Sequence, residues 1–449
     1  METVGINRRS ATFDDLGSLQ ESFIVKSRDY KLQYAHLYFM RLVLMRPKVL
    51  EQAELKWGSL SPVPKRVEKV LDVQQGEISY IVGTVYMDMK LKPNILNDIT
   101  KDHWITAQPD RPKYIDDDDS VYLEDESGRI KLTGPKIAGD IFVTGVVMGI
   151  LGSEDVNGDF KVVDVCYSVN PPQEQISLMD TDEGDKYVAL VSGLGIGSSE
   201  FKPLQLDLLA EYLTGEIGGI KEQTNSSNIV RVMIAGNSIV TPEIVEDDMK
   251  AKKYGYDRSS FVTEPTTILN NFLQELCTSV SVDIMPGESD PSSVTMPQQP
   301  IHPALLRSAR DYSTFQSVTN PYWSCIDNVT ILGTSGQTID DIYKYVKSEN
   351  RLEMAKKTLD WGHMAPTAPD TLWCYPFKDK DPFIMKQTPH IYFIGNQDKF
   401  VTELVTGKGG HQTRIVMLPA FVTTGTIALV NLRTLDCHSV SISTDANKE

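Results

Sequence analysis

The chain has 449 residues, and 41% of them are hydrophobic, which is enough to build two or three folded domains. Asp and Glu number 61 against 44 Lys and Arg, which gives a formal net charge of -17. This charge argues against a surface that binds nucleic acid by itself, because such binding relies on Lys and Arg displacing the counterions of phosphates. It suits a protein whose partners are basic.

The five cysteines are widely spaced and include no CxxC pair. This pattern favours reduced thiols in a cytosolic or nuclear compartment over a disulfide framework or a zinc knuckle. The first residues lack the apolar core of a secretory signal, and no stretch reaches the roughly 20 apolar residues that span a membrane. We therefore expect neither secretion nor a membrane anchor.

Residues 1–28 are mixed and polar, and we expect a loose N-terminal arm. Residues 29–75 are predicted to form a helical segment followed by a linker. Apolar and aromatic side chains recur at helical spacing between residues 34 and 45, and Pro47 is expected to end or kink this helix. The apolar face can dock onto its own domain or serve as an interface for a partner, and both interpretations stay open.

Residues 76–180 are predicted to form an OB-fold domain, a small Greek-key β-barrel, with an inserted acidic loop. β-branched and aromatic residues mark about five short strands, and Ser127-Gly128 and Asn157-Gly158 are typical hairpin turns. Four successive aspartates at 116–119 could bind a cation, but a solvated acidic loop is the more common outcome of such a run.

Barrels of this kind often bind single-stranded nucleic acid through aromatic side chains in a basic groove. The predicted strands carry Tyr80, Tyr86 and Tyr122, but many acidic residues accompany them. We therefore favour a protein-contact role for the barrel and keep single-strand binding as an alternative.

Residues 181–440 alternate near-continuous apolar runs with helical patterns, which predicts an α/β domain whose sheets are covered by helices. Residues 441–449 form a predicted polar tail. The expected fold class is thus multidomain α+β and α/β: an N-terminal helix, a barrel and an α/β sandwich. The segment 366–377, which contains Trp373 and Tyr375, is expected either to cover the core or to form an interface.

Four predicted strands of this α/β domain end in glycine-containing turns with polar side chains. The order and spacing of these turns resemble the calcineurin-like metallophosphoesterases, whose turns read D-x-H, G-D, G-N-H-D/E and G-H-x-H. That chemistry needs carboxylates and imidazoles that hold two divalent metals about 3.5–4 Å apart. In this chain the turns are Ser192-Gly193-Leu194, Gly236-Asn237, Gly287-Glu288-Ser289-Asp290 and Gly395-Asn396-Gln397.

The sequence departs from the phosphoesterase pattern at nearly every ligand position. Most of the side chains there are neutral, and none of the seven histidines falls on these turns. Glu288 and Asp290 alone would give at best a weak oxygen-ligand site. We predict no catalytic residue, no metal and no cofactor here. The predicted degenerate positions are Ser192, Leu194, Asn237, Glu288, Ser289, Asp290, Asn396 and Gln397.

Several longer sequence motifs follow one another along the chain between about residues 29 and 440. They include YAHLYFMRLVLMRP, RPKYIDDDDSVYLEDESGRIKLTG, LVSGLGIG, VDIMPGESDP, MPQQPIHP, VTNPY and LGTSGQ. These motifs, together with a barrel followed by a ligand-stripped phosphoesterase domain, resemble the small (second) subunits of eukaryotic DNA polymerase delta, which are B-type subunits of replicative polymerases.

This resemblance implies a noncatalytic scaffold in DNA replication and repair synthesis, located in the nucleus. It implies binding to the C-terminal domain of the catalytic subunit and to the third subunit of polymerase delta, and indirect contact with the sliding clamp. Contact with DNA is expected to be weak or indirect. The alternatives are a residual metal-dependent phosphodiesterase and a single-strand-binding OB protein.

Overall fold

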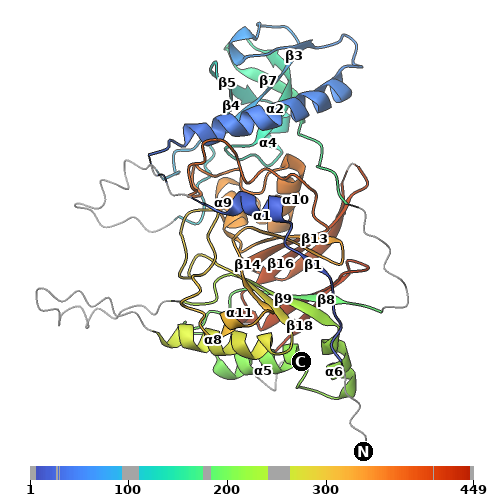
Figure 1. Cartoon of the computed structure of the whole chain (residues 1–449). Coiled ribbons are helices and arrows are strands. Elements are labelled where there is room, and N and C mark those ends of the chain that lie inside the picture. The colour runs from blue at the N-terminus through green and yellow to red at the C-terminus, as the bar shows by residue number, and fades with distance from the viewer. Residues whose placement is uncertain are drawn as a thin grey trace, which may run out of the picture.

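The structure is a computed structural model that describes residues 7–26, 29, 31–93, 111–174, 184–240, 263–407 and 409–444. Residues 1–6 of the predicted arm, most of the predicted acidic insertion and residues 445–449 of the predicted tail lie outside the described part. Figure 1 shows a β-barrel stacked on a larger α/β domain. None of the helices in these ranges is long and apolar enough to cross a membrane.

The barrel is a closed sheet, as the strand patterns predict. Strand β3 pairs antiparallel with both β4 and β6, which closes a ring in the order β3-β4-β5-β7-β6, and β2 adds at the edge. The two predicted hairpin turns join β4 to β5 and β6 to β7. The bounds are β2 Lys65–Arg66, β3 Ser79–Asp88, β4 Ser120–Glu124, β5 Arg129–Thr133, β6 Val147–Glu154 and β7 Phe160–Cys166, with η2 Val70–Asp72 and α4 Pro135–Ala138 in the connections.

Helix α2 (Ala35–Trp57) lies along the outside of the barrel. Leu42, Val49 and Trp57 of this helix are buried against side chains of β3 and β6, so one face of the predicted apolar helix docks onto its own domain. The opposite face is open, and the Phe39 side chain there is 57% exposed.

Pro47 lies inside α2, so of the two expected outcomes, an end or a kink of the helix, the end is wrong. A proline has no backbone N–H and leaves the carbonyl of the residue four positions earlier, here Val43, without its helical partner. Pro47 and Val43 both lie on the exposed face, where solvent reaches that carbonyl. The helix therefore continues for ten residues beyond the proline.

The larger domain consists of two mixed six-stranded sheets packed face to face. Helices α5 and α8 cover the outer face of one sheet, and α9 and α10 cover the outer face of the other, next to the barrel (Figure 1). The first sheet has the order β11-β10-β9-β8-β17-β18, and the second β1-β12-β13-β14-β16-β15. This arrangement confirms the predicted α/β character.

The bounds of the first sheet are β8 Tyr187–Val191, β9 Ile229–Ala235, β10 Ser281–Met285, β11 Phe315–Ser317, β17 Thr426–Asn431 and β18 Cys437–Ser441. Those of the second are β1 Phe13–Asp14, β12 Tyr322–Ile326, β13 Val329–Thr334, β14 Ile391–Gln397, β15 Val401–Thr406 and β16 Gln412–Pro419. The helices are α1 Gly17–Gln20, η1 Glu21–Phe23, α5 Pro203–Thr214, α6 Ile220–Ser227, α8 Glu264–Cys277, η4 Ala309–Asp311, α9 Gln337–Tyr345, α10 Arg351–Trp361 and α11 Phe421–Thr424.

The N-terminal arm is packed from its first described residues onward, so the expectation of a loose arm is wrong for this part. The Arg8 guanidinium donates to four backbone carbonyls of the α/β domain. Strand β1 pairs with β12, so that Phe13 lies opposite Ile326, and the guanidinium of Arg231 lies 3.6 Å from the centre of the Phe13 ring. Phe23 is fully buried. The arm is therefore part of the α/β domain.

A buried arginine of α2 joins the barrel to the α/β domain. Arg41 Nε donates to Asp381 Oδ2 at 2.6 Å. Its two terminal nitrogens donate to the carbonyls of Gly145, Pro366 and Ala368 at 2.6–3.1 Å. The side chains of Arg41 and Asp381 are both inaccessible to solvent. Because these partners come from both domains, the guanidinium fixes the barrel relative to the sandwich.

The carboxylate of Asp381 has two further donors. His363 Nε2 lies 2.9 Å from Asp381 Oδ2, and the backbone N–H of Phe383 donates to Oδ1. The backbone N–H of Ala365 donates to His363 Nδ1, which places the proton of a neutral imidazole on Nε2. Burial and the neighbouring Arg41 lower the pKa of His363 to about 4. The histidine is thus neutral at physiological pH, and Arg41 supplies the only formal positive charge of this cluster.

Candidate functional site

The four predicted turns meet at one end of the sandwich. Strands β8, β9 and β10 are parallel neighbours, so the turns that follow them share one edge. The backbone N–H of Gly193 donates to the carbonyl of Gly236 at 2.9 Å, which links the first two turns. The side chain of Asn396, from the other sheet, donates to the carbonyl of Ala235 at 3.0 Å. The structure therefore brings together the turns that the sequence singled out.

The first turn uses its side chains for structure. Ser192 is fully buried, and its hydroxyl donates to the carbonyls of Leu418 and Pro419 at 3.3 and 3.0 Å. The same oxygen accepts from the backbone N–H of Asn396 at 3.1 Å. Leu194 packs in the apolar core between the sheet and helices α5 and α8. Neither side chain faces an open site.

Asn237 and Ser289 hold the second turn against the third. Asn237 has a left-handed backbone with φ 54, a conformation that asparagine tolerates better than most residues. Its Oδ1 accepts from the backbone N–H of Ser289 at 3.2 Å and from the Ser289 hydroxyl at 3.4 Å. Gly287 is needed here, because a Cβ on it would lie 2.3 Å from the backbone nitrogen of Asn237.

Asp290 is an acceptor of backbone donors. Its Oδ1 accepts from the N–H groups of Ser238 and Ile239 at 2.9 and 2.8 Å, and its Oδ2 accepts from Gly287 at 2.8 Å. Burial raises the pKa of Asp290 to about 6, although these hydrogen bonds oppose the shift. Both carboxylate oxygens of Asp290 accept hydrogen bonds. The side chain therefore connects the second turn to the third and has little capacity left to bind a cation.

The side chains of the fourth turn also make hydrogen bonds within the chain, and only the buried Oδ1 of Asn396 has no partner among the described residues. The amide nitrogen of Asn396 donates to the carbonyls of Ala235 and Ser335. The Gln397 side chain donates to the carbonyl of Gly395 and accepts from Arg351 at 3.1 Å. Arg351 also pairs with Asp340, so a carboxylate close to the turn is already neutralised by a guanidinium.

Sequence reasoning missed a network of neutral side chains beside the turns. Asn320 Nδ2, with its two N–H donors, lies within hydrogen-bond distance, 2.7–3.0 Å, of side-chain oxygens of Gln298, Ser335 and Gln337. Gln298 in turn donates to the carbonyl of Gly287 at 3.0 Å, which connects the network to the third turn. The signal was present in the motifs MPQQPIHP, VTNPY and LGTSGQ, which contain these four residues, although nothing in their composition assigned them a role.

Glu288 alone among the predicted positions is exposed. It lies at the rim of a cavity of about 430 Å³ that also involves Asp340, Lys344 and the 65% exposed Trp373. Within the described ranges, no group of three His, Cys, Asp or Glu side chains is arranged to hold a metal ion. The site is a set of interlocked turns lined by amides, with one unpaired acid at its edge.

The structure bears on two alternatives for the barrel: cation binding by the aspartates at 116–119, and base stacking by its aromatic side chains. Of the four aspartates at 116–119, Asp118 pairs with Lys90 at 2.7 Å and Asp117 pairs with Lys347, which favours an acidic loop held by lysines over a cation site. Tyr86 has the cations of Lys92 and Arg129 over its ring, at 4.8 and 5.2 Å. The ring therefore already makes cation–π contacts within the chain.

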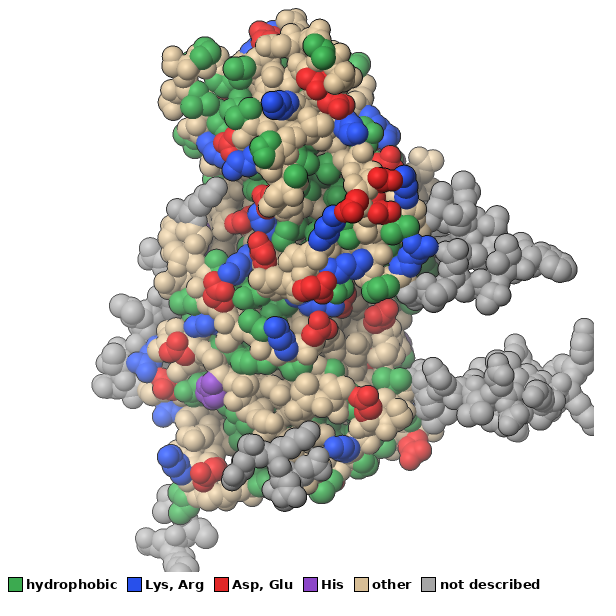
Figure 2. Space-filling model, turned by 180° about the vertical axis from the view of Figure 1, so that it is seen from behind, with side chains coloured by type: hydrophobic (Ala, Val, Ile, Leu, Met, Phe, Trp, Pro, Cys, Tyr) green, Lys and Arg blue, Asp and Glu red, His purple; other side chains and the backbone are tan. Residues whose placement is uncertain are grey.

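The other aromatic side chains of the barrel are also engaged. Tyr122 lies 6.0 Å from the same Arg129 guanidinium, and Tyr80 is buried next to Trp57. Figure 2 shows acidic and basic side chains interspersed over the visible face of the molecule. These features weaken the single-strand-binding alternative, which needs free aromatic faces in a basic groove.

The segment 366–377 divides between its two expected roles. Tyr375 is buried and its hydroxyl accepts from the backbone N–H of Asp29, so this end covers the core. Trp373 is mostly exposed.

Two family models match most of the described structure. The model described as DNA polymerase delta subunit OB-fold domain matches residues 33–165. The model for the B subunits of DNA polymerases alpha and epsilon matches residues 188–402. The first match confirms the OB-fold prediction for the barrel, and the second covers all four turns of the site.

Similar proteins extend over nearly the whole chain. A DNA polymerase delta small subunit of Arabidopsis thaliana is 43% identical over 436 residues, which cover 97% of each chain. A DNA polymerase delta subunit 2 of Drosophila melanogaster is 36% identical and covers 98% of this chain and 99% of its own. A DNA polymerase delta small subunit of Saccharomyces cerevisiae is 37% identical and covers 93% of this chain and 91% of its own.

Proposed function

Because this chain belongs to the family of DNA polymerase delta small subunits, we propose that it acts as the noncatalytic scaffold of a polymerase delta complex. In this proposal it bridges the C-terminal domain of the catalytic subunit and the third subunit, and through the latter it is connected to the sliding clamp. It works in the nucleus, in DNA replication and repair synthesis. Any contact of its own with DNA is weak or indirect.

The proposal that the chain is noncatalytic rests on one observation: the polar side chains of the four turns, except that of Glu288, are used in hydrogen bonds within the chain. Asp290 accepts three backbone hydrogen bonds, and Ser192 makes three. Two-metal hydrolysis needs several charged oxygen and imidazole ligands that face an open space. We infer that these degenerate phosphoesterase positions now stabilise the sandwich instead of binding metal.

The fixed orientation of the two domains supports the bridging part. A scaffold holds its partners at a set distance only if its own parts do not move relative to each other. The buried contacts of Arg41 tie α2 and the barrel to the loop that carries Asp381 in the α/β domain. Partners that bind the barrel and the sandwich would therefore be held in one geometry.

The outer face of α2 is our candidate for a subunit contact. Phe39, Val43 and Leu44 lie within two turns of this helix and are each 44–57% exposed. Large apolar side chains grouped on one exposed helix face are typical of protein interfaces.

Co-purification tests the bridging role. We expect that a tagged C-terminal domain of the catalytic subunit retains the N-terminal part of the third subunit only when this chain is present. Replacing Phe39 and Val43 with glutamate should weaken retention of at least one partner about tenfold or more, because it places charges in an apolar contact. The matched control is Leu204→Glu on α5, at the opposite end of the molecule, which is also exposed. Equal retention of the third subunit without this chain would contradict the bridging role.

A further inference from the structure

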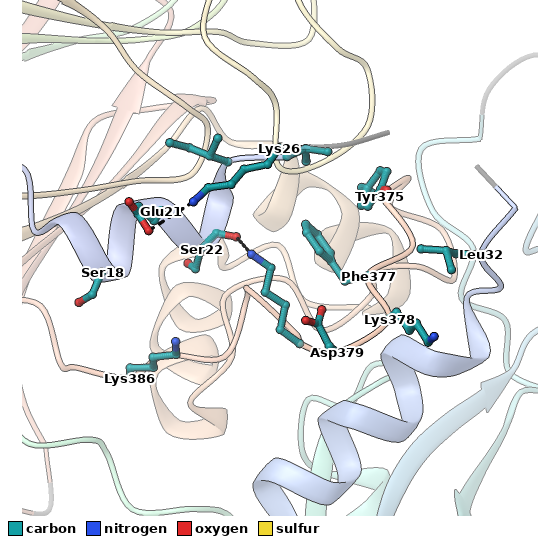
Figure 3. A pocket seen from close by; sticks show the side chains of 13 residues that line it. Ser18, Glu21, Ser22, Lys26, Leu32, Tyr375, Phe377, Lys378, Asp379 and Lys386 are labelled. Atoms are coloured by element: carbon teal, nitrogen blue, oxygen red, sulfur yellow. Dashed lines mark hydrogen bonds and ion pairs between the residues drawn. The ribbon is translucent and has the colours of Figure 1, made fainter. Parts of the chain in front are cut away.

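A pocket of about 510 Å³ lies between the N-terminal arm and the loop that leads into β14 (Figure 3). One wall comes from α1, η1 and the residues directly after them, and the other from residues 375–386. This pocket is separate from the four turns. It exists because the arm is packed onto the α/β domain.

The pocket has a local excess of positive charge in a chain whose net charge is -17. Four lysines line it, against two acids, Glu21 and Asp379. The lysines are Lys26, Lys378, Lys380 and Lys386.

Two of these lysines are not neutralised. Among the residues that the structure describes, Lys378 and Lys386 are exposed and form no ion pair. Lys26 pairs with Glu21 only at 3.7 Å, with both side chains largely exposed. The ammonium groups therefore remain available to an external anion.

Lys380 lies deeper and shows that the lysines are close enough to repel each other. Its Nζ donates to the carbonyl of Ser22 at 2.8 Å and lies 5.0 Å from the centre of the Phe377 ring. Burial lowers the pKa of Lys380; the charges of Asp379 and Glu21 oppose this shift, and those of Lys386 and Lys26 act in the same direction as burial. An anionic group in the pocket would relieve this repulsion.

The walls between the lysines include apolar side chains. Ile24 is 39% exposed and, together with Val25 and Leu32, forms an apolar part of the lining. Figure 3 shows Leu32, Tyr375 and Phe377 on one side of the pocket and the arm with Glu21 and Ser22 on the other. A ligand that combines negative charge with an apolar group therefore matches this lining best.

We propose that this pocket, between the N-terminal arm and residues 375–386, docks an acidic peptide segment of another protein in which Asp or Glu residues flank a Leu- or Phe-type side chain. The carboxylates pair with Lys378 and Lys386, and the apolar side chain lies against the apolar part of the lining. The net charge of -17 of the whole chain disfavours binding of such an acidic segment elsewhere, which favours this pocket.

A nucleic acid strand fits the pocket less well. Strand binding relies on aromatic faces that stack on bases, and Tyr375 and Phe377 are buried, packed on each other at 5.0 Å between ring centres. Glu21 and Asp379 in the lining would also lie against a continuous phosphate backbone, whereas a peptide can place its carboxylates away from them.

Binding of a labelled synthetic peptide, measured by fluorescence anisotropy on the full chain, tests the proposal. The probe carries Leu-Phe between two acidic residues on each side. We expect saturable binding that becomes about tenfold weaker in the Lys378→Glu/Lys386→Glu variant, because two attractive charge pairs turn repulsive. The matched control is Lys48→Glu/Lys136→Glu, which changes the net charge equally at exposed lysines remote from the pocket.

Three results would overturn the proposal. The first is absence of saturable binding to the native chain, and the second is an equal loss of affinity in the pocket variant and the control variant. The third is stronger binding of an oligothymidine of similar length that the pocket variant abolishes, which would assign the pocket to nucleic acid. None of these results depends on which subunits the chain bridges.

Discussion

Replacing Arg41 with alanine is expected to lower the free energy of unfolding by about 3–5 kcal/mol, because the change leaves the buried carboxylate of Asp381 without its cationic partner. The variant also removes the donors of the Gly145, Pro366 and Ala368 carbonyls. Urea unfolding followed by far-UV circular dichroism measures the change.

A second arginine on the same helix provides the control. Arg46 pairs with Glu126 at 2.7 Å, but both side chains reach solvent. Exposed pairs of this kind contribute about 1 kcal/mol or less, so Arg46→Ala should change stability little. Equal effects of the two substitutions would contradict the role of Arg41 as the junction between barrel and sandwich.

The second large effect is expected when Ser192 is replaced by aspartate, the residue that the phosphoesterase pattern has at this position. The new carboxylate would lie where the serine hydroxyl donates to Leu418 and Pro419, so it would be buried against two carbonyl oxygens. A buried charge without a cationic partner, whose one neighbouring donor is the backbone N–H of Asn396, costs about 3 kcal/mol or more. We expect this loss of stability in urea unfolding, and we expect that added Mn²⁺ does not recover it.

Ser289→Asp is the matched control, because Ser289 is only partly buried and lies next to the exposed Glu288. Its expected effect is within about 1 kcal/mol. If Mn²⁺ restored the stability of Ser192→Asp and left that of Ser289→Asp unchanged, the turns would still form a metal site. It would count against our interpretation of these positions as structural.

The barrel, the α/β domain and the four turns were predictable because their signals are local. Apolar strands followed by glycine turns mark the end of a sheet, and the structure does bring Ser192, Asn237, Asp290 and Asn396 together. What each side chain does there was not predictable, since the hydrogen bonds of Ser192 go to carbonyls more than 200 residues away.

The packing of the N-terminal arm and the contacts of Arg41 between the two domains depend on residues far away in the sequence. Such contacts produce no recognisable pattern in the local sequence. Phe13 pairs with Ile326, and Arg8 donates to carbonyls more than 200 residues later, so the polar composition of the arm gave the wrong expectation. Arg41 is the one charged residue among the buried residues of α2, and the others are apolar. Its acceptors are mostly backbone carbonyls, which carry no sequence signal.

Metal content tests the central claim, that the turns of the sandwich are structural and the chain is a noncatalytic subunit. The purified chain, free of other subunits, would be equilibrated with excess Mn²⁺, desalted and analysed for bound metal. The account predicts close to zero Mn²⁺ per chain. Close to two Mn²⁺ per chain, reduced by Asp290→Asn or Glu288→Gln, would contradict it and would make a metal-dependent phosphodiesterase the better description.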